Sequence, residues 1–269
     1  MSNSILKSDQ KKFNIFLGEF LNKLSNTPTT QMISKELFAM KKKDYVLINN
    51  NLSLPELSQN LLDDIILEKD EIFEILNKLF SKNSKYNNSF HKALLDSNLF
   101  STIISSNYDS IFEDYFFDLL NKQTPFSINK DEVNKISFYK LYGDFNIPDK
   151  FVLSTQDIKR LKILDFYTPF WRKISDDLCK NPTILFGINF SDSTTLGILD
   201  FIFSKIKKQH QPVYLYSDTA INSEITQNFI DTYSITVIEG KMDEFLNIIK
   251  NYFPDLQKEE GDAPLMEYA

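Results

Sequence analysis

Short, continuous runs of apolar residues alternate along this chain with longer segments in which apolar residues recur every three or four positions. Runs of the first kind are typical of strands buried on both faces of a parallel sheet, and segments of the second kind are typical of helices that cover such a sheet. The pattern therefore predicts an α/β fold with a mainly parallel, doubly wound (Rossmann-like) sheet and a helical insertion. About six strands are expected, at residues 13–18, 100–106, 136–143, 183–189, 213–217 and 235–240, with weaker candidates at 45–49 and 151–154.

Two of the expected helices carry well-marked apolar stripes. Residues 110–120 and 241–253 each place apolar side chains on one side of a helix, so both helices are expected to pack against the sheet. The first stripe consists of Ile111, Phe112, Tyr115, Phe116, Leu119 and Leu120. Asp109 stands directly before this helix, where its side-chain oxygen is expected to cap free amide groups.

No internal repeat, low-complexity linker or region rich in proline and glycine divides the chain. We therefore expect a single domain over residues 1–256, followed by a polar, disordered tail at 257–269. A helical insertion is expected at about 29–97, where it would form a lobe beside the site, and a second helical stretch at about 155–181.

Charge and cysteine content disfavour several classes of protein. The formal net charge is −7 and arginine occurs only at Arg160 and Arg172, which argues against nucleic acid as a partner because affinity for a phosphate backbone grows with the number of cations. Cys179 is the only cysteine, and His91 and His210 have no metal-binding spacing, so neither a disulfide nor a metal site is expected. No apolar run is long enough to span a membrane, and we expect a cytoplasmic protein.

Glycine is rare, and its distribution points to a binding site. Four of the six glycines, Gly18, Gly143, Gly187 and Gly240, fall at or near the carboxyl end of an expected strand. Ligands of open α/β sheets bind outside these ends, and glycine allows the backbone to approach them closely. The alternative is that the turns between strands and helices need glycine for their own geometry.

Three polar motifs end apolar runs: SSNYD at 105–109, KLYGDFN at 140–146 and FGINFSDSTTL at 186–196. In this order and rough spacing they resemble motifs of the sirtuin-like, NAD-binding family, which carries a T-N-Y-D-like motif, an L-H-G motif and a G-x-S-x-x-D motif on successive strands. The resemblance extends over residues 13–240. It implies a Rossmann-like fold that binds NAD or an NAD-derived nucleotide.

The resemblance also implies roles for individual residues. Asn107 stands where the family has its catalytic asparagine, which contacts the nicotinamide ribose and positions the attacking water or acceptor, and Tyr142 stands in place of the general-base histidine. Cofactor binding is implied for Gly18, Asn22, Asp109, Gly143, Gly187, Asn189, Ser191 and Asp192. If so, Asn107, Gly143, Gly187 and Asp192 should meet in one cleft. The alternative roles are structural, with Asn107 as a turn residue and Asp192 as a helix cap.

The chain departs from the family pattern in the loop after the first strand and at the catalytic base. The family has a glycine-rich G-A-G-x-S loop where this sequence reads FLGEFLNKLSNTP, so Phe20 is expected to hinder approach to a pyrophosphate and Glu19 to repel it. Tyr142 is a poor base because a phenol has a pKa of about 10. The Cys-x-x-Cys pairs of zinc-dependent deacylases are also absent.

Three interpretations of function remain open at this point. The first is a degenerate sirtuin-like domain that binds a nucleotide, a protein partner or a second copy of itself, in a setting such as bacterial defence. The second is an active NAD glycohydrolase, an NAD-depleting defence effector that uses Asn107. The third is an unrelated Rossmann-like protein whose motifs match by chance.

Overall fold

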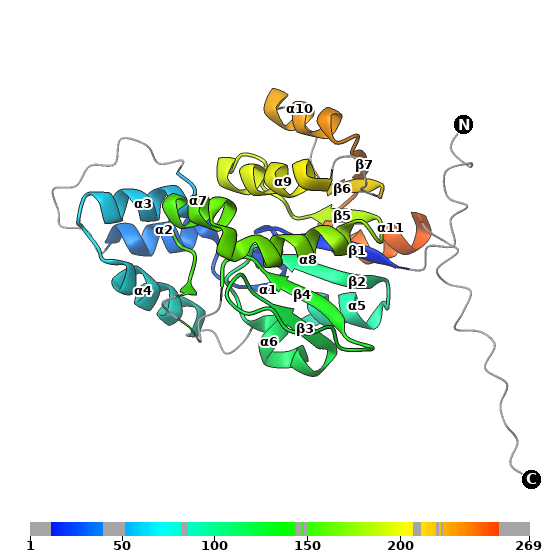
Figure 1. Cartoon of the computed structure of the whole chain (residues 1–269), viewed down its shortest axis with the longest axis horizontal. Helices are drawn as coiled ribbons and strands as arrows, with labels where there is room; N and C mark the ends of the chain where they lie inside the picture. Colours follow the sequence, from blue (N-terminus) through cyan, green and yellow to red (C-terminus); the bar gives the residue numbers. More distant parts are fainter. Residues whose placement is uncertain are drawn as a thin grey trace, which may run out of the picture.

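The computed structural model describes residues 12–39, 52–81, 86–143, 147, 150–206, 211–218, 221 and 223–252. At its centre is a seven-stranded sheet with the order β3-β4-β2-β1-β5-β6-β7 (Figure 1). Every pair of neighbouring strands is parallel, which confirms the predicted α/β fold. The strands are β1 (Phe13–Leu17), β2 (Phe100–Ser105), β3 (Leu120–Gln123), β4 (Ile136–Lys140), β5 (Thr183–Phe186), β6 (Val213–Ser217) and β7 (Thr236–Glu239).

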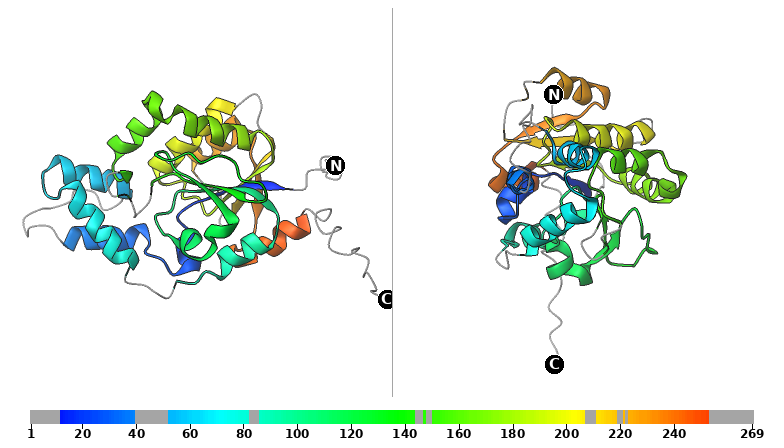
Figure 2. Two further views of the ribbon diagram at one scale, coloured as in Figure 1. Left: turned by 60° about the horizontal axis from the view of Figure 1, so that its bottom comes forward. Right: turned by 90° about the vertical axis from the view of Figure 1, so that its left-hand side faces the viewer.

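Successive residues of a strand point to opposite faces of the sheet, and in these strands the residues on both faces are apolar. Helices therefore cover both faces. Leu17 and Phe186 pack toward one face, together with α1 (Leu21–Ser25), α5 (Ser89–Asp96), α6 (Ile111–Phe116) and α11 (Phe245–Tyr252). Phe16 and Leu185 pack toward the other, together with α8 (Thr168–Leu178), α9 (Ser193–Ile206) and α10 (Glu224–Thr232). Figure 2 shows the two layers from two further directions.

A lobe of three helices lies beyond the carboxyl end of the central strand. It consists of α2 (Thr30–Ala39), α3 (Leu54–Asp63) and α4 (Lys69–Ser81), which Figure 1 shows grouped at the left of the molecule. Two side-chain bonds join α3 to the start of α9, since the Ser193 hydroxyl donates to Glu56 (3.1 Å) and the Ser53 and Thr194 hydroxyls lie 3.3 Å apart. α5 packs against the sheet instead. The stretch at 155–181 forms α7 (Thr155–Ile163) and α8.

The prediction of one helix over 110–120 is wrong in its second half. α6 ends at Phe116, a 3-10 turn follows at Phe117–Leu119, and residues 120–123 form the unpredicted edge strand β3. Tyr115 and Leu119 from the predicted buried stripe are 50% and 49% exposed. The strand was hidden because its sequence, LNKQ, is polar. Its Asn121 and Gln123 side chains bond instead to the backbone at residues 129 and 130, which run beside this edge.

Smaller differences concern strand ends. β4 and β5 stop before Gly143 and Gly187, whose φ angles of +90° and +69° leave the extended conformation. Residues 151–154 form no strand, although Phe151 is buried and the Val152 amide donates to the Tyr142 carbonyl (2.9 Å). The weak strand at 45–49, His210 and the predicted tail at 257–269 lie outside the described residues.

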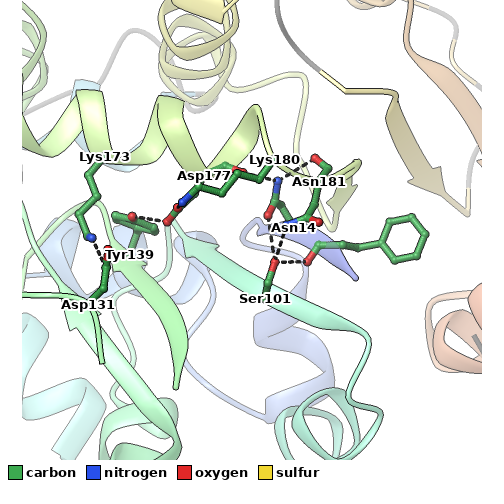
Figure 3. Close-up of polar contacts among 9 residues, drawn as sticks. Asn14, Ser101, Asp131, Tyr139, Lys173, Asp177, Lys180 and Asn181 are labelled. Carbon is green, nitrogen blue, oxygen red and sulfur yellow. Dashed lines mark hydrogen bonds and ion pairs between the residues drawn. The ribbon is translucent and has the colours of Figure 1, made fainter. Parts of the chain in front are cut away.

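A buried polar network fastens α8 to the sheet (Figure 3). The Asn14 amide, fully buried in β1, donates to the carbonyl groups of Asp177 (3.1 Å) and Asn181 (2.9 Å). The Tyr139 hydroxyl from β4 donates to the Asp177 carboxylate (2.6 Å), which Lys180 also contacts (2.6 Å). Because a buried polar group without a partner costs free energy, this network favours one position of α8 on the sheet.

Candidate functional site

The strand order places the reversal of connection at β1. From this central strand the chain proceeds to β2, β3 and β4 on one side and to β5, β6 and β7 on the other. Ligands of open α/β sheets bind outside the carboxyl ends of strands at such a reversal. The loops that follow β1, β2 and β5 therefore form the expected position of a site.

A hollow of about 670 Å³ occupies this position, and we call it the main hollow. Its walls come from the loops after β1, β2, β4 and β5 and from α2 and the start of α3. The lining residues are Glu19, Asn22, Thr30, Gln31, Ile33, Ser34, Leu52, Ser53, Leu54, Pro55, Ser106, Asn107, Tyr108, Tyr142, Asn189, Ser191, Asp192 and Thr195.

Six of the ten residues singled out in the sequence line the main hollow, and four do not. Those that line it are Asn22, Asn107, Tyr142, Asn189, Ser191 and Asp192. Those outside the lining are Gly18, Asp109, Gly143 and Gly187. Asn107 and Asp192 thus line one cavity, while Gly143 and Gly187, which were expected beside them, are not among its lining residues.

Packing explains the glycine at position 18. A Cβ atom there would overlap the carbonyl oxygen of Gly187 and lie 2.8 Å from its carbonyl carbon. The loops after β1 and β5 are held at this distance by two backbone bonds, from the Gly18 amide to Phe186 (2.9 Å) and from the Phe20 amide to Gly187 (3.0 Å). Gly18 therefore serves close contact between two loops, which differs from the alternative considered for these glycines, since Gly18 is not one of the glycines with a positive φ.

Asn107 has the most informative environment in the cleft. It is 3% exposed, and neither its side-chain oxygen nor its side-chain nitrogen has a hydrogen-bond partner. Its backbone amide is held by the Ser105 hydroxyl (3.1 Å). Buried amide side chains are nearly always paired, so this side chain can offer the two N–H donors of its nitrogen and its carbonyl acceptor to a ligand or a bound water.

Asn22, which also lines the main hollow, repeats this feature in part. Its side-chain nitrogen donates to the Pro28 carbonyl (3.1 Å), while its side-chain oxygen is buried without a partner. The main hollow is thus bordered by two asparagines whose hydrogen-bonding capacity is incompletely used. A ligand with hydroxyl or amide groups would satisfy them.

Tyr142 occupies the wall between the β4 loop and α9. Its ring stacks on the ring of Tyr108, with 5.4 Å between the ring centroids, and the residue is 5% exposed. Burial is the largest influence that raises the pKa of the Tyr142 phenol, and the negative charges of Asp192 and Glu19 raise this pKa further. A hydrogen bond with Thr195 lowers it in part. The phenol therefore stays protonated at neutral pH and can donate a hydrogen bond but cannot accept a proton.

Asp192 performs the helix-capping role considered for it from the sequence. Its carboxylate accepts from the Thr194 amide (2.9 Å) and the Thr195 hydroxyl (2.6 Å) at the start of α9. Asn189 orders the same loop, since its side-chain oxygen accepts from the Ser191 amide (3.0 Å). The amides at this helix end are therefore partly used by the protein itself.

Asp109 is buried and is not among the residues that line the main hollow. Its carboxylate accepts from the Ile111 amide (3.1 Å), and Ser110, not Asp109, is the residue that immediately precedes α6. Burial raises the pKa of Asp109 to about 6, against the opposing influence of Lys140. The Lys140 ammonium is itself buried, with bonds to the Asp109 carbonyl (2.6 Å) and to Glu113 (2.6 Å).

A second hollow of about 270 Å³ adjoins the first. Asn189 and Ser191 line both, and the second also includes residues at the end of β6. Phe20, which was expected to hinder approach to a pyrophosphate, lines this second hollow and not the main one. Thr30 and Ser53 also line the main hollow. The helical periodicity of the sequence did not indicate this, because an apolar stripe does not show which end of a helix meets a cleft.

The described part of the chain contains neither a cluster of metal-ligating side chains nor a membrane-spanning helix. No group of three or more histidine, cysteine, aspartate or glutamate residues there is arranged to hold a metal ion. None of the helices in those segments is both long and apolar enough to cross a membrane.

Comparison with protein families gives a match over the middle and later parts of the chain. The family model described as the SIR2-like domain matches residues 101–238, just over half of the chain. The match begins in β2 and ends in β7, so β1 and the loop that follows it lie outside it. No curated protein matches the chain.

Proposed function

Because this chain belongs to the SIR2-like domain family, whose members generally bind NAD, we propose that its main hollow binds NAD or an NAD-derived nucleotide. We further propose that the protein works as a binding module with little hydrolytic activity. Such a module acts through a protein partner or a second copy of itself, in a setting such as bacterial defence.

The observation that carries this proposal is the pair of unpaired groups on Asn107. A buried amide with a free donor and a free acceptor lowers stability by about 1–3 kcal/mol unless something satisfies it. A ribose offers adjacent hydroxyl groups that both donate and accept, and the free oxygen of Asn22 can accept from another hydroxyl or from a carboxamide. The chemistry of the lining therefore suits a nucleoside.

Slow turnover is expected because the lining has no suitable base. Loss of a positioned general base forfeits about 10²- to 10⁴-fold in rate, and the protonated Tyr142 phenol cannot replace it. No histidine is among the residues that line the main hollow. His91 is buried against Phe112 instead, with 4.6 Å between the ring centroids.

One observation favours the alternative of an active NAD glycohydrolase. Glu19 is a carboxylate in the same hollow as Asn107, and a carboxylate can accept a proton from an attacking water. In this case Asn107 would position the water and Glu19 would replace the histidine of the family.

The test is calorimetric titration with NAD and ADP-ribose, combined with mass spectrometry of the products. Asn107→Ala should weaken nucleotide binding by about 1–3 kcal/mol, because it removes the groups that would contact the ligand. Asn228→Ala, at an exposed position in α10, is the matched control. Unchanged affinity of the Asn107 variant would contradict the proposed site, and rapid release of nicotinamide by the unaltered protein would support the hydrolase instead.

A further inference from the structure

Glu19 forms a bridge across the place where the two hollows meet. Its carboxylate accepts from the Asn189 side-chain nitrogen (2.6 Å) in the loop after β5 and from the Thr30 hydroxyl at the start of α2. Asn189 lines both hollows, while Glu19 lines the main hollow. The next residue, Phe20, lines the second hollow. The bridge therefore lies where the linings of the two hollows meet, and we call this place the passage.

The charge of this passage is negative on both sides. The charged residues that line the main hollow are Glu19 and Asp192, and Asp218 is the charged residue that lines the second. No lysine or arginine is among the described residues that line either hollow. A phosphate placed between the hollows would face carboxylates without a compensating cation, and like charges at such a contact are strongly unfavourable.

We infer that Glu19 is a specificity-determining residue, and that it makes the cleft select a phosphate-free, cationic nucleoside over an intact dinucleotide. This inference rests on the proposed function, because it concerns the ligand of the same cleft. A dinucleotide that spans both hollows must displace the Glu19–Asn189 bond and bring its pyrophosphate to a carboxylate. A nucleoside confined to the main hollow leaves the bond intact, and a pyridinium ring is attracted by Glu19 and Asp192.

Nicotinamide riboside and NAD are suitable probes because they share the pyridinium nucleoside and differ in the pyrophosphate and adenosine. The measured quantity is the ratio of their dissociation constants for one protein, which cancels any general loss of folded material. The unaltered protein should bind nicotinamide riboside more tightly than NAD. Raising the salt concentration should weaken riboside binding and strengthen NAD binding, because screening reduces both the attraction and the repulsion.

Two substitutions separate the charge of Glu19 from its bulk. Glu19→Gln keeps a side chain that can bridge Asn189 and Thr30 but removes the charge, and it should shift the ratio toward NAD by about tenfold. Glu19→Ala also opens the passage and should shift the ratio at least as far. Glu36→Gln, an exposed carboxylate on α2, is the matched control and should leave the ratio unchanged.

The outcomes distinguish the inference from the proposed function. Tighter binding of NAD than of the riboside by the unaltered protein, or an unchanged ratio in both Glu19 variants, would overturn the inference and leave the proposed nucleotide site standing. Absence of binding of either probe to the unaltered protein and to all variants would overturn both. Thermal unfolding of each variant checks that its fold is retained.

Discussion

The backbone of Gly18 rests directly against the backbone of Gly187, so that two loops from adjacent strands touch where the sheet reverses its connection. This contact sets the distance between Glu19 and Asn189, which bridge the same loops one and two residues further along. Neither glycine lines the cleft. Their contact instead determines where the lining residues that follow them are placed.

The first prediction concerns this contact. Gly18→Ala should lower the free energy of unfolding by about 1–3 kcal/mol, because the added methyl group overlaps backbone atoms that cannot move independently. Gly197→Ala is the matched control, since a Cβ there meets nothing closer than the Lys162 ammonium at 3.8 Å. Within helix α9 this change should be neutral or stabilise by up to about 1 kcal/mol. Urea unfolding measures both, and equal effects would contradict the packing explanation.

The second prediction concerns the buried network of α8. Asn14→Ala should destabilise the protein by about 2–4 kcal/mol, because it removes a fully buried side chain that donates to the carbonyl groups of Asp177 and Asn181, of which the first keeps the Lys180 amide (3.1 Å) as a donor. Asn228→Ala, at an exposed position in α10, should change stability by less than about 0.5 kcal/mol. Thermal and urea unfolding provide the comparison. A loss no larger for Asn14 than for Asn228 would show that the network contributes little.

The third prediction is an acid sensitivity caused by His91. Burial lowers its pKa from 6.5 to about 4, with the charge of Glu113 acting in the opposite direction, and neither ring nitrogen has a hydrogen-bond partner. The unfolded chain therefore binds a proton between pH 6.5 and 4 that the folded chain does not, so this residue makes stability fall as pH falls through that range. His91→Leu should remove up to about 3 kcal/mol of this loss at pH 4. Urea unfolding at pH 7 and pH 4 measures it, and identical pH slopes for both proteins would refute it.

The fourth prediction has the opposite sign and concerns Asp109. Its pKa is raised by burial from 3.8 to about 6, so the folded chain holds a proton between pH 4 and 6 that the unfolded chain releases. This residue therefore makes stability fall as pH rises through that range. Asp109→Asn should stabilise the protein at pH 7 by up to about 3 kcal/mol and have little effect at pH 4. A stability gain that is independent of pH would mean that ionisation of Asp109 is not its cause.

The fifth prediction concerns the missing base. Tyr142→His should raise the rate of NAD hydrolysis by about 10²-fold or more if NAD reaches the main hollow, because an imidazole can accept a proton at neutral pH. The gain should disappear in the double variant with Asn107→Ala, since that side chain borders the same cavity. Mass spectrometry of released nicotinamide measures the rate. A gain that survives loss of Asn107 would place the chemistry elsewhere.

The sequence by itself determined the fold class and the approximate positions of six strands, because buried parallel strands require continuous apolar runs and short runs are a local signal. The sequence also predicted that Asn107, Tyr142 and Asp192 lie at the same end of the sheet, since the carboxyl ends of parallel strands meet there.

The tertiary structure decided the features that local sequence patterns do not contain. The polar strand β3 pairs with β4, and its Asn121 and Gln123 side chains bond to the backbone of residues 129 and 130. Glu19 and Asn189 are 170 positions apart in sequence and meet only because β1 and β5 are neighbours. Hydrogen bonds between residues so far apart in the sequence depend on the order of the strands, and that order is established only when the chain folds.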